Sequence, residues 1–258
     1  MNHVTTKELA LWLDDTLQPQ RFRDYCPNGL QVAGKSQIKR VVTGVTASMA
    51  LLQAAIDRQA DALLVHHGWF WKNEDTRLIG TRRERIALAL KHDLNLFAYH
   101  LPLDAHPQLG NNAQLGKVLG LTPELDAQGA PMTCGPDGLI WLGRCAPGNT
   151  LQTLGRHVAQ ALGRTPLLIG PNDQAVSRIA WCTGGAQGMM QAAVDAGAQV
   201  YLTGEASEPN FHLANETGTS FIAAGHHATE RYGVQALGQA ASEALGIEVE
   251  FIDLPNPI

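Results

Sequence analysis

Imidazole and carboxylate groups follow several apolar runs in this sequence, and both are common ligands of divalent metals. His66 and His67 directly follow residues 62–65, a fully apolar run with the length of a buried strand. Asp104 comes shortly after a second predicted strand, residues 94–98, in which every residue except Asn95 is apolar. Because the carboxyl ends of parallel strands lie at one edge of a sheet, side chains that follow such runs are placed to share a site.

A second pair of adjacent histidines follows the apolar run 220–224. The pattern from Tyr232 to Leu245 is helical. If this helix begins near His226, then Glu230 lies on the same helical face as His226. A histidine and a glutamate at that spacing can reach one metal ion.

These groups are more numerous than the ligands of one catalytic metal, which has about three protein ligands and keeps an open position. We therefore predict two divalent metals per subunit, with Glu230 as the bridging carboxylate. The alternative is that the histidines are core or surface residues held by hydrogen bonds. Zinc, manganese, iron and nickel are all candidates, since metal availability and geometry decide the choice. The predicted ligands are His66, His67, Asp104, His226 and Glu230.

Four further polar residues lie near these positions in the sequence. Metal-bound imidazoles need an orienting acceptor, so Glu205 and His106 are expected beside ligands rather than as ligands. His100 and His227 either belong to the same supporting group or act as general acid–base groups that move protons.

Two other segments could contact a ligand. The run Trp69-Phe70-Trp71 is either a stacking platform for a heterocycle or a hydrophobic plug or subunit contact. The glycine-rich turn that begins at Thr183 is either an ordinary tight turn or a phosphate-binding loop. It lacks the Lys-Ser/Thr of a P-loop.

An internal repeat organises the chain. Residues 41–68 match residues 179–206 at a constant offset, with Gln53-Ala54-Ala55-Ile56-Asp57 over Gln191-Ala192-Ala193-Val194-Asp195. Together with the alternation of strand and helix patterns, this predicts an α/β fold of two pseudo-repeated βαβ-containing lobes with facing sheets. We expect lobe one at about residues 1–125, a connecting and variable stretch at about 126–177, and lobe two at about 178–258.

The bulk composition excludes several classes of protein. The 258 residues carry a net charge of −5, which gives no indication of nucleic-acid binding. No apolar run approaches the roughly 20 residues of a membrane helix, and the N-terminus has no signal-peptide pattern. The four cysteines form no Cys-x-x-Cys pair. We expect a reduced, soluble, cytoplasmic protein without a membrane partner.

Several motifs together resemble the Nif-three-like family, whose members are also known as GTP cyclohydrolase I type 2 homologues. They are Val65-His66-His67-Gly68-Trp69-Phe70-Trp71, His100-Leu101-Pro102-Leu103-Asp104-Ala105-His106, Gly110-Asn111-Asn112, Thr203-Gly204-Glu205 and Gly225-His226-His227-Ala228-Thr229-Glu230. The resemblance covers nearly the whole chain and is strongest to compact bacterial members. It implies a dinuclear metal site with the ligands named above and a toroidal homohexamer.

These observations favour a metal-dependent hydrolase of a small nucleotide-like substrate, with a GTP cyclohydrolase-type reaction as one version of it. One alternative is a metal-dependent scaffold or regulatory binding protein without turnover. A further alternative is a metallopeptidase or amidase, because two-metal sites also serve those reactions.

Overall fold

A computed structural model describes residues 3–258 of the chain. The chain forms two compact units. Unit 1 contains the residues up to Leu103 together with Val234–Pro255, and unit 2 contains Asp104–Gly233 and Asn256–Ile258. The stretch 126–177 therefore lies within unit 2.

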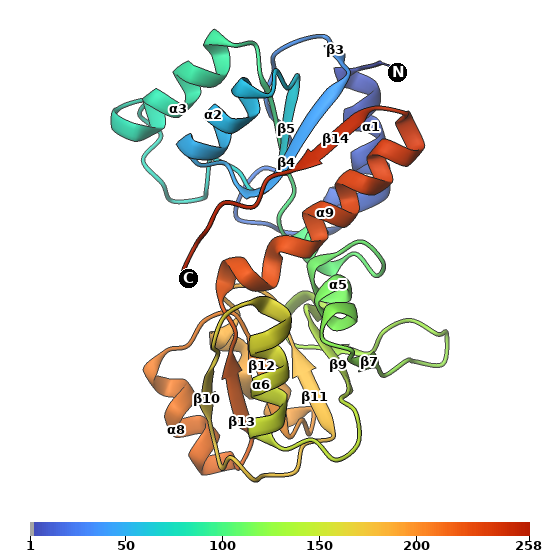
Figure 1. Cartoon of the computed structure of the whole chain (residues 1–258), viewed down its shortest axis with the longest axis vertical. Coiled ribbons are helices and arrows are strands. Elements are labelled where there is room, and N and C mark those ends of the chain that lie inside the picture. The colour runs from blue at the N-terminus through green and yellow to red at the C-terminus, as the bar shows by residue number, and fades with distance from the viewer. Residues whose placement is uncertain (1–2) are drawn as a thin grey trace. The chain divides into compact units, whose positions relative to one another are not determined.

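The sheet of unit 1 is mostly parallel and carries His66 and His67 at its carboxyl edge (Figure 1). Four strands run parallel, and a fifth pairs antiparallel at one edge. In spatial order they are β14 (Glu248–Phe251), β4 (Arg40–Thr46), β5 (Ala62–His67), β6 (Asn95–Ala98) and β2 (Gly29–Val32). The short strands β1 (Val4–Thr5) and β3 (Gln37–Ile38) form a separate pair.

Helices cover both faces of this sheet, as Figure 1 shows. They are α1 (Thr6–Leu17), η1 (Pro19–Arg21), α2 (Met49–Asp57), α3 (Gly80–Lys91), α4 (Leu101–Ala105) and α9 (His226–Leu245), of which α4 and α9 cross the boundary between the units. Successive residues of β4 face opposite sides: a Cβ at Gly44 would meet Leu51 of α2, whereas a Cβ at Gly238 of α9 would meet Thr43. Because both faces are covered, apolar residues occupy successive positions in the central strands, as at Val41 and Val42 of β4 and at residues 62–65 of β5.

The start of α1 agrees with the sequence, but the start of α3 does not. The spacing of Thr5 and Glu8 in the sequence predicts a capping box, and the structure contains it: the Thr5 hydroxyl accepts from the Glu8 N–H, and the Glu8 carboxylate accepts from the Thr5 N–H. The same spacing at Thr81 and Glu84 predicts a second box, which is wrong, because α3 begins at Gly80 and its N-cap is Ile79. Thr81 is thus already inside the first turn.

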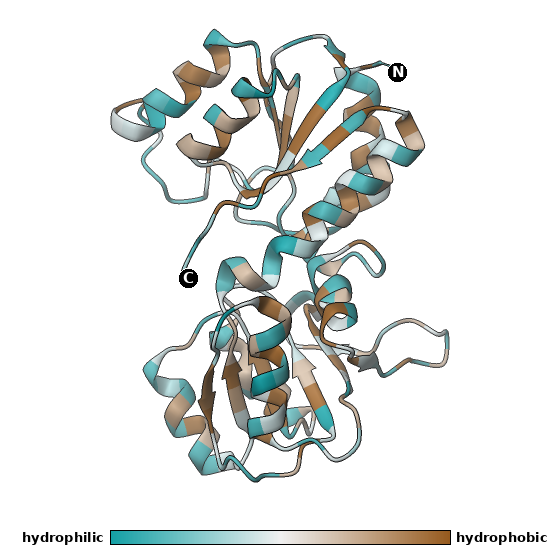
Figure 2. Cartoon of the chain, viewed as in Figure 1, coloured by the Kyte–Doolittle hydropathy of each residue, from teal (hydrophilic) through white to brown (hydrophobic). Residues whose placement is uncertain are grey.

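The sheet of unit 2 has a parallel centre with antiparallel edges. Its order is β10 (Leu167–Ile169), β13 (Ser220–Ala223), β12 (Val200–Thr203), β11 (Arg178–Trp181), β9 (Ile140–Arg144) and β7 (Thr122–Pro123), with β8 (Thr133–Cys134) also paired to β9. The helices are α5 (Asn111–Val118), η2 (Pro136–Gly138), α6 (Leu151–Leu162), η3 (Gln187–Met189), α7 (Met190–Asp195) and α8 (Glu208–Thr217). Figure 2 shows the hydrophobic strands against the apolar stripe of α6.

The predicted internal repeat is confirmed by the pairing register. In unit 1, Val41 of β4 pairs with Ala62 of β5, and in unit 2, Ile179 of β11 pairs with Val200 of β12, so the offset of 138 holds at both strands.

Side chains repeat the same contacts in both units. The Gln53 amide donates to Asp57 at 2.8 Å, and the Gln191 amide donates to Asp195 at 2.8 Å. The Arg40 guanidinium donates to the carbonyl of Arg58, and that of Arg178 to the carbonyl of Ala196. The repeat therefore extends from the strand register to the side-chain contacts of the two segments.

Within residues 3–258, no helix is long and apolar enough to cross a membrane.

Candidate functional site

His66 is fully buried at the end of β5 and is fixed in one orientation. Its Nδ1 lies 2.9 Å from the carbonyl oxygen of Tyr99. Since a carbonyl only accepts, Nδ1 carries the ring proton, and the lone pair of the neutral ring is on Nε2. This is the form in which a histidine binds a metal through Nε2. Tyr99 is itself anchored by a 2.7 Å hydrogen bond from its hydroxyl to Asp14.

Three histidines of unit 1, His66, His67 and His100, form what we call the histidine cluster. Each offers a ring nitrogen within 4.8 Å of those of the other two. The ring centroids of His66 and His67 are 4.5 Å apart, so these adjacent residues stay close at the strand end instead of diverging. His67 Nδ1 lies 3.1 Å from the Thr46 hydroxyl of the neighbouring strand. The cluster therefore has the donor types and spacing of a metal site.

His100 is held by a carboxylate that the sequence did not single out. Its Nδ1 lies 2.8 Å from Asp24 Oδ1, so Nδ1 donates and Nε2 can accept. Asp24 Oδ2 accepts from the backbone N–H of Leu101 and from the Asn28 amide. Burial raises the pKa of Asp24, but the hydrogen bond and charge of His100 and the other donors outweigh it and lower the pKa to about 2.

Asp24→Asn is expected to weaken the fold in a pH-dependent way. Since the pKa of Asp24 falls from 3.8 to about 2 on folding, its charge stabilises the native state above pH 3.8, and this stabilisation is lost as the pH falls through 2. Near pH 7 the free energy of unfolding of Asp24→Asn should be lower than that of the wild type by about 1–2 kcal/mol, after allowance for solvent screening. Urea titrations from pH 7 to pH 2.5 measure it.

The matched control for this prediction is Asp15→Asn, which changes an exposed carboxylate on α1. We expect it to alter the free energy of unfolding by less than about 0.5 kcal/mol. A difference between wild type and Asp24→Asn that stays the same from pH 7 to pH 2.5 would contradict the assigned role of Asp24.

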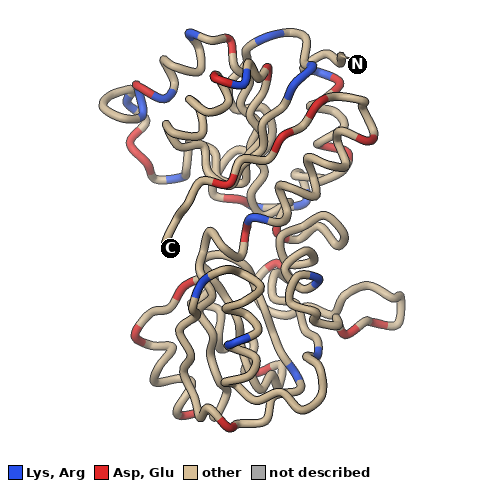
Figure 3. Tube along the Cα trace, viewed as in Figure 1, with Lys and Arg blue, Asp and Glu red and all other residues tan. Residues whose placement is uncertain are grey.

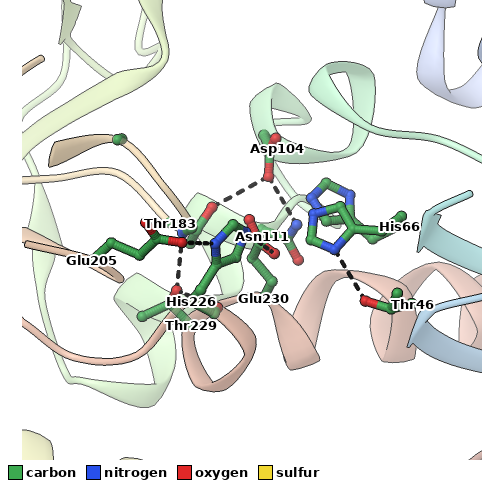
Figure 4. Close-up of polar contacts among 12 residues, drawn as sticks. Thr46, His66, Asp104, Asn111, Thr183, Glu205, His226, Thr229 and Glu230 are labelled. Atoms are coloured by element: carbon green, nitrogen blue, oxygen red, sulfur yellow. Dashed lines mark hydrogen bonds and ion pairs between the residues drawn. The ribbon is translucent and has the colours of Figure 1, made fainter. Parts of the chain in front are cut away.

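In unit 2, Asp104 of α4 is buried and oriented by neutral donors. The Asn111 amide donates to Asp104 Oδ1 at 2.8 Å, and the Thr183 hydroxyl lies 3.2 Å from the same oxygen (Figure 4). Asn111 is further fixed by the N–H of Gly233, which donates to its side-chain oxygen. The carboxylate is therefore held in a set orientation by two donors, Asn111 and Thr183, of which Asn111 is fixed in turn by Gly233.

His226 and Glu230 lie on one face of the first turns of α9, as the spacing predicts. His226 Nε2 is 3.2 Å from Glu230 Oε2, and Glu230 is 2 % exposed. On the other side of the ring, His226 Nδ1 is 2.6 Å from Glu205 Oε1 (Figure 4). Glu205 thus orients His226 from beside it, which is the position that the sequence predicts for this carboxylate. Burial lowers the pKa of His226, but the two carboxylates outweigh it and raise the pKa to about 9.

The glycine-rich turn supports this arrangement. Gly184 has a φ of +67°, and a Cβ there would lie 2.0 Å from Glu230 Oε1, so only glycine leaves room for the carboxylate. The backbone N–H of Gly184 donates to the Thr229 hydroxyl, and the N–H of Thr183 donates to Asn112. Because the N–H groups of Thr183 and Gly184 are already used inside the protein, these contacts favour a structural turn over a phosphate-binding loop.

In the aromatic run Trp69-Phe70-Trp71, the two tryptophans have different surroundings. Trp69 is buried, and its ring N–H donates to the carbonyl of Ala47 at 2.9 Å. Trp71 instead packs edge-on against His100, with ring centroids 5.0 Å apart, and lies 5.9 Å from His67. Of the two large aromatic rings, only Trp71 borders the histidine cluster.

Two other histidines named from the sequence have different surroundings. His106 Nδ1 accepts from the backbone N–H groups of Gln108 and Leu109, which stabilises a turn. The backbone N–H of His227 donates to the carbonyl of Ile258. Neither contact makes these residues metal ligands, and the role of His227 in proton transfer stays a prediction.

A model of the family described as Duf34/NIF3 (NGG1p interacting factor 3) matches residues 4–257. This chain belongs to the Duf34/NIF3 family. The match spans both units, so it includes the repeat, the histidine cluster of unit 1, and Asp104, His226 and Glu230 of unit 2.

Similar NIF3-family proteins are known from several bacteria. The chain is 52% identical over 245 residues to a protein of Pseudomonas aeruginosa named "GTP cyclohydrolase 1 type 2 homolog", covering 95% of each chain. A protein of the same name from Neisseria meningitidis serogroup A is 50% identical over 254 residues, covering 98% of this chain and 99% of the relative. The solved structure of protein ybgI, described as of unknown function, has a TM-score of 0.92 at 43% identity and covers 99% of this chain and 100% of the other.

Four residues that position the site were not singled out for that role by sequence reasoning: Asp24, Thr46, Asn111 and Thr183. Asn111 stands in a motif that carries the family resemblance, but its role as a donor to Asp104 has no local signal. Asp24 is 76 residues from His100 in the sequence. At this separation no local spacing indicates that Asp24 contacts His100.

Proposed function

We propose that this NIF3-family chain binds two divalent metal ions and hydrolyses a small nucleotide-like substrate. The proposed ligands are His66, His67, Asp104, His226 and Glu230. The observation that carries the proposal is that His66 and His226 each have Nδ1 tied to a fixed oxygen acceptor, Tyr99 O and Glu205 Oε1. This leaves Nε2 as the ligand atom in both, which is the pattern of metal-binding histidines with orienting partners.

The residues fit a metal in both type and burial. Glu230 and Asp104 are 2 % and 7 % exposed, and buried carboxylates in proteins are paired or bind metals. The Asn111 amide and the Thr183 hydroxyl fix the direction of Asp104. When bound, the metals would supply Lewis acidity and activate a water molecule near neutral pH.

The chain's own residues would then orient the substrate and move protons. His100 donates its Nδ1–H to Asp24, so its Nε2 can accept a proton from water and then pass that proton to a leaving group. Trp71 offers an aromatic edge beside His100. The name shared by the Pseudomonas and Neisseria relatives supports a nucleotide-like substrate, with GTP cyclohydrolase-type chemistry as one candidate.

The reaction can be tested with metal-loaded protein and a panel of nucleotides and phosphoesters. We expect turnover of at least one nucleotide, and its loss in Glu230→Gln. No turnover above that variant across the panel would reject the hydrolase and favour the second candidate, a metal-dependent scaffold. Peptide and amide substrates belong in the same panel, because two-metal sites also hydrolyse those bonds.

We also propose that the protein assembles as a homohexamer, as the family resemblance implies. Native mass spectrometry should then give a species of six times the 27.7 kDa chain. A monomer or dimer at micromolar concentration would contradict this assembly.

A further inference from the structure

Unit 1 contains a pocket of about 290 Å³ that shares a wall with the histidine cluster. Trp71 forms this wall, since it lines the pocket and also packs against His100 and His67. The other lining residues come from the loop after β5 and from the start of α3, and they are Gly68, Trp69, Glu74, Asp75, Thr81, Arg82 and Arg85.

Two arginines of this pocket have unsatisfied donors. Arg82 and Arg85 are half-buried, whereas Arg83 and Glu84 between them are exposed. The Nε atoms of Arg82 and Arg85 are buried and have no hydrogen-bond partner among residues 3–258. A guanidinium is always charged and has no acceptor of its own. Because buried donors are nearly always paired in native proteins, these two N–H groups call for an acceptor from outside the chain.

The other contacts of the pocket residues do not provide an acceptor for the Nε–H groups of Arg82 and Arg85. Arg82 donates to the carbonyl of Asp75 and lies 5.2 Å over the Phe70 ring, so its direction is fixed. The Asp75 carboxylate, which also lines the pocket, is bonded to Arg77 at 2.8 Å. Glu74 is the other acid in the lining, and it is exposed.

The charge of this segment differs in sign from that of the whole chain. Residues 72–85 contain five lysines and arginines and three acids, a net charge of +2, whereas the chain has a net charge of −5. Figure 3 shows basic positions along this loop and α3. Helix α3 begins here at Gly80 with no acid in its first turn and no side-chain cap, so its first N–H groups add to the positive potential.

We propose that this pocket binds the phosphate of a mononucleotide, with Arg82 and Arg85 on the phosphate and Trp71 against the base. A phosphate has enough oxygens to accept hydrogen bonds from two guanidinium groups at once, whereas one carboxylate has only two oxygens. An indole is a good stacking surface for a planar ring. A volume near 290 Å³ is at the lower end for small-molecule sites, which favours a mononucleotide over a dinucleotide. The inference deepens the proposed function, because Trp71 would hold the base beside the histidine cluster.

The test uses full-length protein stripped of metal with EDTA, and calorimetric titration with guanosine monophosphate, guanosine and inorganic phosphate. Arg82→Gln and Arg85→Gln should each weaken binding of the nucleotide about tenfold or more and leave the weak binding of guanosine unchanged. Arg83→Gln is the matched control, since it removes the same charge from an exposed position of the same helix, and it should change the affinity less than twofold.

Two further measurements keep the inference falsifiable. Arg82→Lys and Arg85→Lys keep the charge but lose the paired donors, so they should bind the nucleotide with intermediate affinity, and thermal unfolding checks that every variant is folded. Equal affinity of all variants, or equal weakening by Arg83→Gln, would overturn the phosphate site. Because metal-free protein is used, this outcome is separate from the metal content and turnover that test the proposed function.

Discussion

Glu230→Gln is expected to reduce the metal content from two ions per chain to one or none. The glutamine amide has nearly the same shape, but it lacks the negative charge and the second ligand oxygen that a bridging carboxylate provides. Glu230 is almost fully buried and faces His226 Nε2 at 3.2 Å, so no solvent-exposed group can easily replace it. Metal analysis by inductively coupled plasma mass spectrometry after gel filtration measures the effect.

The matched control for Glu230→Gln lies on the same helix. Glu243 is an exposed carboxylate near the end of α9 and accepts from Gln239 at 2.6 Å. Glu243→Gln should keep the wild-type metal content. If Glu230→Gln also retained two ions per chain, Glu230 would not be the bridging ligand.

Gly184→Ala is expected to impair both the fold and the metal content. A side chain at a φ of +67° costs about 1–3 kcal/mol. The added Cβ would also lie 2.0 Å from Glu230 Oε1 and 3.1 Å from His226 Nε2, so the carboxylate or the turn must shift. We expect a fall in melting temperature of several degrees and at least a tenfold loss of metal affinity, measured by differential scanning calorimetry and by competition with a chelator.

Gly188→Ala, in η3 four residues along the chain from Gly184, separates this effect from a general cost of alanine. Gly188 has no heavy atom within 4 Å of an added Cβ, and its φ is not positive. This variant should match the wild type in melting temperature and metal affinity. If Gly188→Ala lowered the melting temperature and the metal affinity as much as Gly184→Ala, the loss would not be explained by a clash with Glu230.

Local patterns predicted a good part of this protein because the physics that sets them is local. The Thr5–Glu8 capping box and the start of α9 at His226 depend on residues within one helical turn. Residues 62–65 of β5, which ends at His67, and residues 221–223 of β13, which ends at Ala223, are apolar runs, since both faces of each sheet are covered. The repeat needed only a constant offset, and the pairing register then confirmed it.

Some predictions failed or stayed ambiguous where local rules compete. Thr81 and Glu84 have capping-box spacing, yet α3 starts at Gly80, because a box motif does not prevent a helix from starting earlier. The glycines of the turn at Thr183 are also typical of a phosphate-binding loop. In the structure the N–H groups of Thr183 and Gly184 donate to Asn112 and Thr229, which belong to other elements.

The sequence by itself determined which side chains are fit for metal chemistry and that most of them follow strand ends. Only the tertiary structure decided how they are held. The proton of His66 is on Nδ1 because the Tyr99 carbonyl of the next strand accepts it. Asp24 reaches His100 across 76 residues of chain, and Gly184 leaves the space that Glu230 fills. Such contacts depend on packing between segments far apart in sequence, whose partners no local periodicity or spacing encodes.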